Sequence, residues 1–156
     1  MLKSLVTKIG ISSTLCLILG TTSGLLTVTG VNSWYTTINK PWWNPPNWIF
    51  GPVWTILYLL MGASFAIAWH KGGQVGRKMM LLFVVQFLLN LVWSPTFFYF
   101  HNITLAFLII ALMWVIILLT IFAAGKVKPV AAWLLVPYIS WVSFAMILNG
   151  TIMLMN

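Results

Sequence analysis

Five long runs of apolar residues, separated by shorter polar or proline-rich segments, occupy most of the chain. As a helix, each run is long enough to cross about 30 Å of hydrocarbon. The pattern therefore predicts an all-α membrane protein in which residues 1–156 form one domain, a bundle of five transmembrane helices. The expected spans cover residues 9–28, 52–69, 79–98, 103–124 and 130–153. We expect the first run to be a helix of the mature protein, because its apolar part is too long for a signal peptide.

The composition agrees with this class and excludes several others. The 156 residues are 62% hydrophobic and 5% charged, and they include eight Lys or Arg but no Asp or Glu. Without carboxylates the chain has no acid pair for glycosidase or aspartic-protease chemistry. It also has no acidic cage for Ca²⁺ or Mg²⁺ and no buried acid for proton-coupled transport. The net charge of +8 is not gathered on a soluble face, so we expect no nucleic-acid partner.

The basic residues are unevenly distributed among the connecting segments. If the chain crosses the bilayer five times, every Lys and Arg except Lys40 falls on one side. Because Lys and Arg are retained on the cytoplasmic side, the sequence predicts a cytoplasmic N-terminus and a C-terminus outside. Residues 70–78, which are polar and rich in glycine, are expected to form a mobile loop on the cytoplasmic side. Pro95 and Pro137 lie inside predicted helices, where each removes a backbone hydrogen bond and favours a kink.

The connection between the first two spans, residues 31–54, is the longest segment predicted to be non-helical, and it is rich in Trp and Pro. Indole side chains are typical of the membrane interface, which explains several of these tryptophans as an aromatic belt. The prolines have a further effect, since they stiffen the loop and reduce the entropy lost when it adopts one shape. We therefore expect this loop, with Trp43, Pro45 and Pro46, to form a lid over the helices.

Aromatic and polar side chains recur at helical spacing in three of the predicted spans. Amides such as Gln86 and Asn90 face the interior of a membrane protein or a neighbouring helix, so these stripes are expected to line the inside of the bundle. Indoles and Tyr hydroxyls around an apolar space suit a flat aromatic ligand. The alternative is that the stripes only pack the helices together. The stripes are Trp54, Tyr58, Met61 and Phe65; Gln86, Asn90, Trp93 and Phe97; and Tyr138, Trp141, Ala145 and Asn149.

Four separated blocks, in order, resemble the TspO/MBR family (translocator protein or peripheral-type benzodiazepine receptor). They are WYTTINKPWWNPP (34–46), GPVWTILY (51–58), NLVWSPTFF (90–98) and AAWLLVPYISWVSFAMILN (131–149). The resemblance implies a five-helix transmembrane bundle in which the loop after the first helix caps a ligand pocket. It implies protoporphyrin IX and other tetrapyrroles as ligands, with sterols in eukaryotic members and isoquinoline and benzodiazepine drugs. It also implies a homodimer.

The resemblance assigns expected roles to individual side chains. Trp54 and Asn90 are expected to donate hydrogen bonds to a ligand carbonyl. Trp54 and Trp141 match the tryptophans implicated in light-dependent porphyrin breakdown in some bacterial members, and they are catalytic candidates only if this chain has that activity. The ligand-binding positions carried over from the family are Tyr35, Trp54, Tyr58, Asn90, Trp93, Phe97, Tyr138, Trp141 and Ala145.

Together, the residues and the resemblance predict a receptor or transport-type protein of the bacterial cytoplasmic (inner) membrane. We expect it to bind porphyrins, haem-related tetrapyrroles or other flat apolar molecules, and to require no cofactor. His70 and His101 are separated by the third span, so a site that clamps a metal between them is not expected. The alternatives are light-dependent degradation of protoporphyrin IX and a sterol-binding or scaffold role. No Lys or Arg follows Tyr138, which departs from the proposed cholesterol motif.

Overall fold

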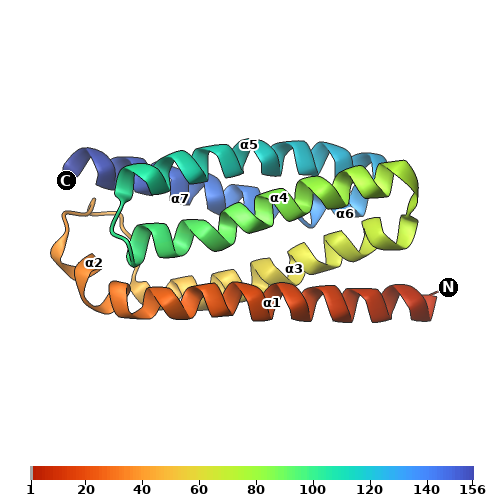
Figure 1. The fold of residues 1–156 in the computed structure, drawn as a ribbon, viewed down its shortest axis with the longest axis horizontal. Helices are drawn as coiled ribbons and strands as arrows, with labels where there is room; N and C mark the ends of the chain where they lie inside the picture. Colours follow the sequence, from red (N-terminus) through yellow and green to blue (C-terminus); the bar gives the residue numbers. More distant parts are fainter. Residues whose placement is uncertain (1) are drawn as a thin grey trace.

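The fold of residues 2–156, described by a computed structural model, is an all-α bundle of five long helices (Figure 1). This confirms the predicted fold class. The spans are α1 (Leu2–Asn32), α3 (Phe50–Lys71), α4 (Gly73–Phe98), α5 (Ile103–Val127) and a fifth made of α6 (Pro129–Trp133) and α7 (Val136–Met155). The short helices α2 (Trp34–Thr37) and η1 (Asn47–Ile49) lie in the connection between α1 and α3.

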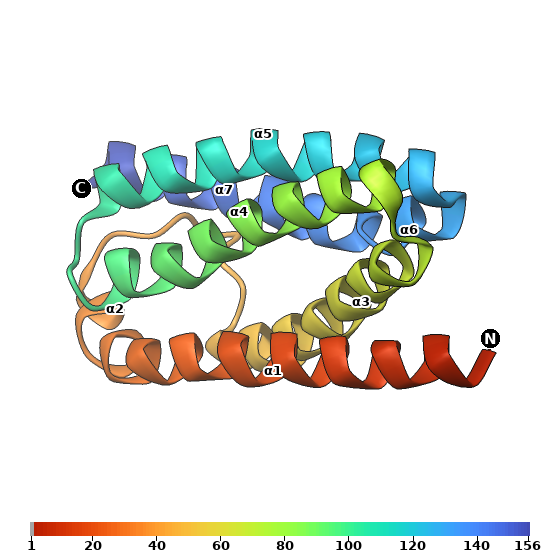
Figure 2. The same ribbon diagram turned by 45° about the vertical axis from the view of Figure 1, so that its right-hand side comes forward.

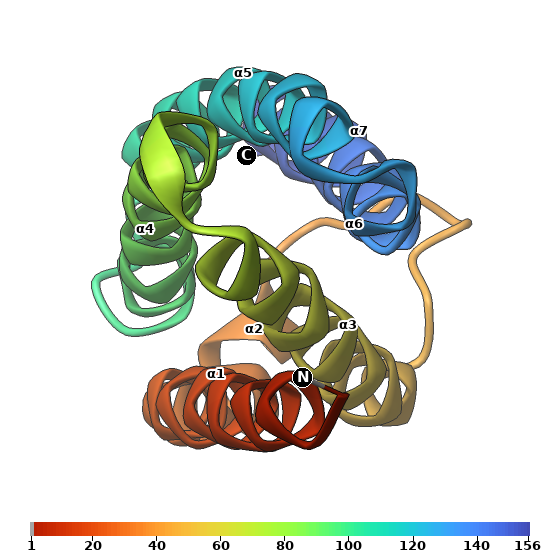
Figure 3. The same ribbon diagram turned by 90° about the vertical axis from the view of Figure 1, so that its right-hand side faces the viewer.

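Seen along the bundle, the helices surround a common axis in the order α1, α3, α6–α7, α5 and α4 (Figure 3). Helix α1 packs on α3 and α4, and α5 packs on α4 and α7. Figure 2 shows α3 crossing α1 at an angle on its way to the start of α4. The two termini lie at opposite ends, as an odd number of spans requires (Figure 1). We call the end with α2, η1 and the C-terminus the loop end, and the other the N-terminal end.

The helix bounds differ from the sequence prediction mainly at the N-terminal end. Helix α1 begins at Leu2 rather than residue 9, and α4 begins at Gly73 rather than residue 79. The prediction of a mobile loop at residues 70–78 is therefore wrong, since Gly72 alone separates α3 from α4. Gly72 and Gly73 have φ angles of 64° and 67°, a left-handed conformation that glycine adopts without strain. Polar residues such as Arg77 continue the helix because they are exposed at its end.

Pro95 does not interrupt α4. A proline has no N–H, so the carbonyl of Leu91, four residues earlier, loses its partner in the helix. That carbonyl accepts a hydrogen bond from Ser23 Oγ of α1 at 2.8 Å. The contact satisfies a carbonyl that would otherwise be unpaired in the membrane, and it joins α4 to α1.

The fifth span, by contrast, is broken two residues before Pro137. Leu135 N donates to Ala132 O, which leaves the carbonyl of Ala131 without its regular partner four residues later. Ser64 Oγ of α3 donates to that carbonyl at 2.7 Å. The structure thus has a short turn between α6 and α7 near the kink expected from Pro137, and α3 satisfies the carbonyl of Ala131 that this turn frees.

Small residues allow α1 and α3 to pack closely. A Cβ atom at Gly62 would overlap the backbone of Ser13 and lie 2.7 Å from the carbonyl carbon of Ser12. A Cβ atom at Gly20 would overlap the ring of Tyr58. These glycines therefore serve contacts within the chain, and the position of Tyr58 depends directly on the absence of a side chain at residue 20.

Candidate ligand cavity

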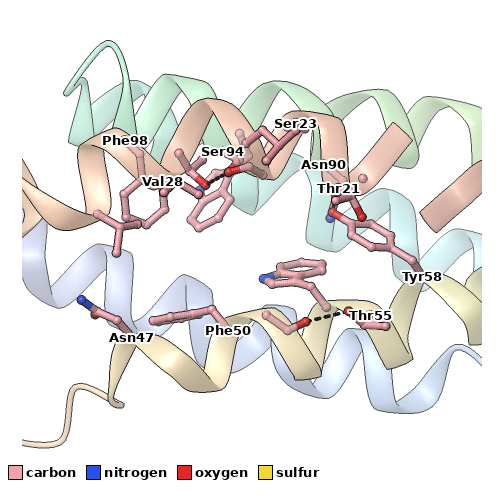
Figure 4. A pocket seen from close by; sticks show the side chains of 18 of the residues that line it. Thr21, Ser23, Val28, Asn47, Phe50, Thr55, Tyr58, Asn90, Ser94 and Phe98 are labelled. Atoms are coloured by element: carbon pink, nitrogen blue, oxygen red, sulfur yellow. Dashed lines mark hydrogen bonds between the residues drawn. The ribbon is translucent and has the colours of Figure 1, made fainter. Parts of the chain in front are cut away.

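A cavity of about 510 Å³ lies at the loop end of the bundle, among α1, η1, α3, α4 and α7. Its lining combines aromatic rings with small and hydroxyl-bearing side chains (Figure 4). Asn47, Phe50 and Phe98 lie toward one end of the view, and Tyr58 and Asn90 toward the other. The predicted ligand-binding residues that line it are Trp54, Tyr58, Asn90, Trp93, Trp141 and Ala145.

A chain of buried hydrogen bonds closes the inner end of the cavity. Tyr58 Oη donates to Asn90 Oδ1 at 2.9 Å, and Asn90 Nδ2 donates to Tyr138 Oη at 3.2 Å. Tyr138 Oη donates in turn to Gln86 Oε1 at 2.6 Å. Because each acceptor is already occupied by a donor, the amide of Asn90 is held in one orientation. Among the side-chain nitrogen and oxygen atoms of these four residues, all within the described part of the protein, only Gln86 Nε2 lacks a hydrogen-bond partner.

The tryptophans of the cavity differ in what their indole N–H groups contact. Trp93 Nε1 donates to Asn149 Oδ1 at 3.2 Å, and Asn149 Nδ2 donates to the carbonyl of Ile103 at the start of α5. Trp54 stacks on Tyr58 with ring centroids 5.4 Å apart. Neither Trp54 nor Trp141 donates to an acceptor within the described part of the chain, so both N–H groups are free for a ligand.

Three predicted ligand-binding residues lie outside the lining, in the layer behind it. Tyr138 is fully buried and positions Asn90. Phe97 stacks on Trp93 with centroids 5.8 Å apart. Tyr35 is only 2% exposed, and its hydroxyl donates to Asn44 Oδ1 at 2.6 Å. Burial raises the pKa of the Tyr35 phenol to about 12, so it remains a protonated donor at neutral pH.

The lid residues expected from the sequence do not line the cavity. Trp43 packs against Phe144 of α7, with ring centroids 5.9 Å apart, and Pro45 and Pro46 lead into η1. The connection instead contributes Asn47 and Trp48, which follow the two prolines. The two prolines thus precede the part of the loop that reaches the cavity.

Helix α1 contributes more of the cavity wall than the sequence prediction assigned to it. Its small and hydroxyl-bearing residues recur every three or four positions and face the bundle. This spacing was visible in the sequence, but the stripes used for prediction were chosen by aromatic and amide side chains. The α1 residues in the lining are Gly20, Thr21, Ser23, Gly24, Leu25, Thr27, Val28, Val31 and Asn32.

Comparison with known proteins places these features in a family. "Tryptophan-rich protein TspO" of Chlorobaculum tepidum is 43% identical over 147 residues, which cover 91% of either chain. "Tryptophan-rich sensory protein" of Cereibacter sphaeroides is 35% identical over 127 residues, covering 80% of this chain and 78% of the relative. Human "Translocator protein" is 36% identical over 119 residues, covering 74% and 70%. The model of the TspO/MBR family matches residues 12–155, and the chain belongs to that family.

Proposed function

We propose that this protein is a membrane receptor or transport-type protein that binds porphyrins and other flat apolar molecules in the cavity. The observation that supports this most strongly is the concentration of aromatic rings around one space inside a five-span membrane bundle. The volume of about 510 Å³ lies within the range of roughly 300–1,000 Å³ that small-molecule sites occupy. The relatives named as sensory and translocator proteins support a role in binding or moving a small molecule.

The chemistry of the walls fits this ligand class. Aromatic rings attract the face and edge of a second aromatic system, so a flat macrocycle gains contact with several rings at once. The unpaired N–H groups of Trp54 and Trp141 are available to a carbonyl or another neutral acceptor. Phe50 and Phe144 hold Trp141 with ring centroids 6.0 and 5.3 Å away, so one wall of the site is already ordered.

A titration with protoporphyrin IX tests the proposal. The purified protein is titrated in mild detergent, and binding is read from the shift of the porphyrin absorption band as well as from quenching of Trp fluorescence. We expect saturable binding that the Trp54→Phe, Trp141→Phe double variant weakens at least tenfold. Trp133→Phe is the matched control, because Trp133 is 71% exposed on α6, outside the cavity lining, and should leave the affinity unchanged. Absence of binding in the wild-type protein would contradict the proposal.

A second candidate function is light-dependent degradation of the bound porphyrin. The observation that favours it is the stacking of Trp54 on Tyr58, since two easily oxidised rings lie side by side in the wall of the cavity. Illumination of the porphyrin complex distinguishes the two functions. Faster loss of porphyrin absorbance with the protein than without it, abolished by Trp54→Phe, supports degradation; equal rates support binding alone.

The orientation in the membrane is also a proposal. The N-terminal end of the bundle contains the start of α1, the adjoining ends of α3 and α4, and the adjoining ends of α5 and α6 (Figure 1). These segments carry every Lys and Arg except Lys40. We infer that this end faces the cytoplasm of a bacterial inner membrane. A C-terminal green fluorescent protein fusion should then be dark and a C-terminal alkaline phosphatase fusion active, and the reverse pattern would contradict the orientation.

A further inference from the structure

The basic residues at the N-terminal end of the bundle have no acidic side chain to pair with. We propose that this end binds an anionic phospholipid, with the headgroup phosphate at Arg77 and Lys78 and an acyl chain along the exposed face of α4. This surface and the cavity lie at opposite ends of the bundle. The inference therefore stands apart from the proposed function, and it does not depend on which side of the membrane this end faces.

The positive charge at the N-terminal end is not neutralised within the chain. The sequence contains no Asp or Glu, and all of its Lys and Arg residues except Lys40 lie at this end. Lys8 packs over Trp69, with its Nζ 5.0 Å from the ring centre, but an aromatic ring leaves the net charge unchanged. Like charges gathered on one surface repel each other, and basic segments beside a bilayer attract anionic headgroups. An anionic lipid therefore supplies the counter-charge that the sequence lacks.

The tight turn between α3 and α4 brings three of these cations to one corner of the bundle. Lys71 is the last residue of α3, and Arg77 and Lys78 lie in the first two turns of α4 (Figure 1). A Cβ atom at Gly76 would lie 2.6 Å from the backbone oxygen of Ala68, so glycine at this position allows α4 to start close against α3. All three cationic side chains are exposed, which leaves them accessible to a headgroup.

An exposed apolar face of α4 continues from this corner toward the middle of the bundle. Residues three or four positions apart lie on the same face of a helix, and one such series starts at Lys78. Its next members, all exposed, are Leu81, Val85, Leu88 and Val92. A phospholipid can contact the cations with its phosphate and this face with an acyl chain, whereas a free phosphate ion gains only the first contact. The combination therefore fits a lipid.

A second exposed apolar series starts from Lys126 on α5 and includes Phe122 and Leu119. It lacks a guanidinium group, because Arg77 is the only arginine in the sequence. A guanidinium presents paired N–H donors to two oxygens of one phosphate, whereas an ammonium acts as a point charge. The geometry therefore favours the start of α4 over the end of α5 as the phosphate site.

Native mass spectrometry of the full chain, released from a mild detergent, tests the inference because it counts the lipids bound to each protein molecule. Phosphatidylglycerol and phosphatidylcholine with the same acyl chains are titrated in parallel. The wild type should bind the anionic lipid at least about tenfold more tightly, and the Arg77→Gln, Lys78→Gln double variant should reduce that ratio to about threefold or less. Comparing the two lipids within each variant cancels any change in general lipid binding.

The matched control is the Lys126→Gln, Lys128→Gln double variant, which removes the same charge from the same end of the bundle. Its ratio should stay within about threefold of the wild-type ratio, since the phosphate site at α4 is intact and exposed charges farther away are screened by salt. Glycerophosphoglycerol, which is the same headgroup without acyl chains, should fail to displace the lipid even in large molar excess.

Equal binding of the two lipids by the wild type would overturn the inference. Equal losses in the two double variants would also overturn it, because they would show a diffuse charge effect rather than a site on α4. Displacement by glycerophosphoglycerol would assign the corner to a free phosphate ester, and a dimer without bound lipid would assign the face of α4 to a second copy of the chain. None of these outcomes bears on porphyrin binding, so the proposed function is tested separately.

Discussion

Gly62→Ala should be strongly destabilising, although alanine is the better helix former. The added methyl group would overlap the backbone of Ser13 and lie 2.7 Å from the carbonyl carbon of Ser12, so α1 and α3 must move apart. Overpacking costs about 1–3 kcal/mol, and a backbone obstacle that cannot rotate away belongs at the upper end. The higher helix propensity of alanine relative to glycine offsets about 1 kcal/mol of this cost. The expected net loss is about 2 kcal/mol, or roughly 4–8 °C in Tm for a chain of this size.

The assay is thermal unfolding in one detergent, followed by the loss of helical circular dichroism. Gly10→Ala is the matched control, because no atom lies within 4 Å of the position that its Cβ would occupy. That variant should unfold at the same temperature as the wild type or slightly higher. Since α1 and α3 both wall the cavity, Gly62→Ala should also weaken porphyrin binding. A Gly62→Ala protein as stable as the Gly10→Ala protein would refute the α1–α3 packing described above.

Two further predictions concern polar contacts between helices. Ser23→Ala should destabilise the protein by about 1 kcal/mol, because it leaves the backbone carbonyl of Leu91 unpaired. Pro95→Ala should remove that cost, because the alanine N–H can donate to the same carbonyl within α4. A double-mutant cycle of the two changes, measured by thermal unfolding, that shows no coupling would contradict this. Asn149→Ala removes a buried amide that joins Trp93 to the carbonyl of Ile103, so it should lower the stability by about 1 kcal/mol and, by freeing the indole of Trp93, weaken porphyrin binding. Melting and titration measure the two effects, and unchanged affinity would show that Trp93 needs no such support.

Much of the fold could be predicted because a bilayer imposes simple requirements on a sequence. Spans need long apolar runs, and all five runs correspond to the observed helices. Their ends were less predictable, since polar residues continue a helix beyond the hydrocarbon, as Arg77 does in α4. The two internal prolines had the same sequence signal and different outcomes. Pro95 lies within the continuous helix α4, whereas Pro137 follows the break between α6 and α7. A proline inside an apolar run predicts a kink in both cases, so the sequence alone does not distinguish these outcomes.

The candidate site was predictable where a side chain itself carries the signal. Aromatic and amide side chains at helical spacing identified Trp54, Asn90 and Trp141 as neighbours of one interior space, and the structure places all three in the cavity lining. The sequence could not separate the lining from the layer behind it, since Tyr138 has the same spacing but lies fully buried. The contribution of α1 was also missed, because glycine and serine indicate close packing without indicating a cavity.

The most direct test of the account is an experimental structure of the protein with protoporphyrin IX. The account predicts the macrocycle in the cavity among α1, η1, α3, α4 and α7, in contact with Trp54 and Trp141. A porphyrin bound on the lipid-facing surface, with the cavity filled by repacked tryptophan side chains, would contradict it.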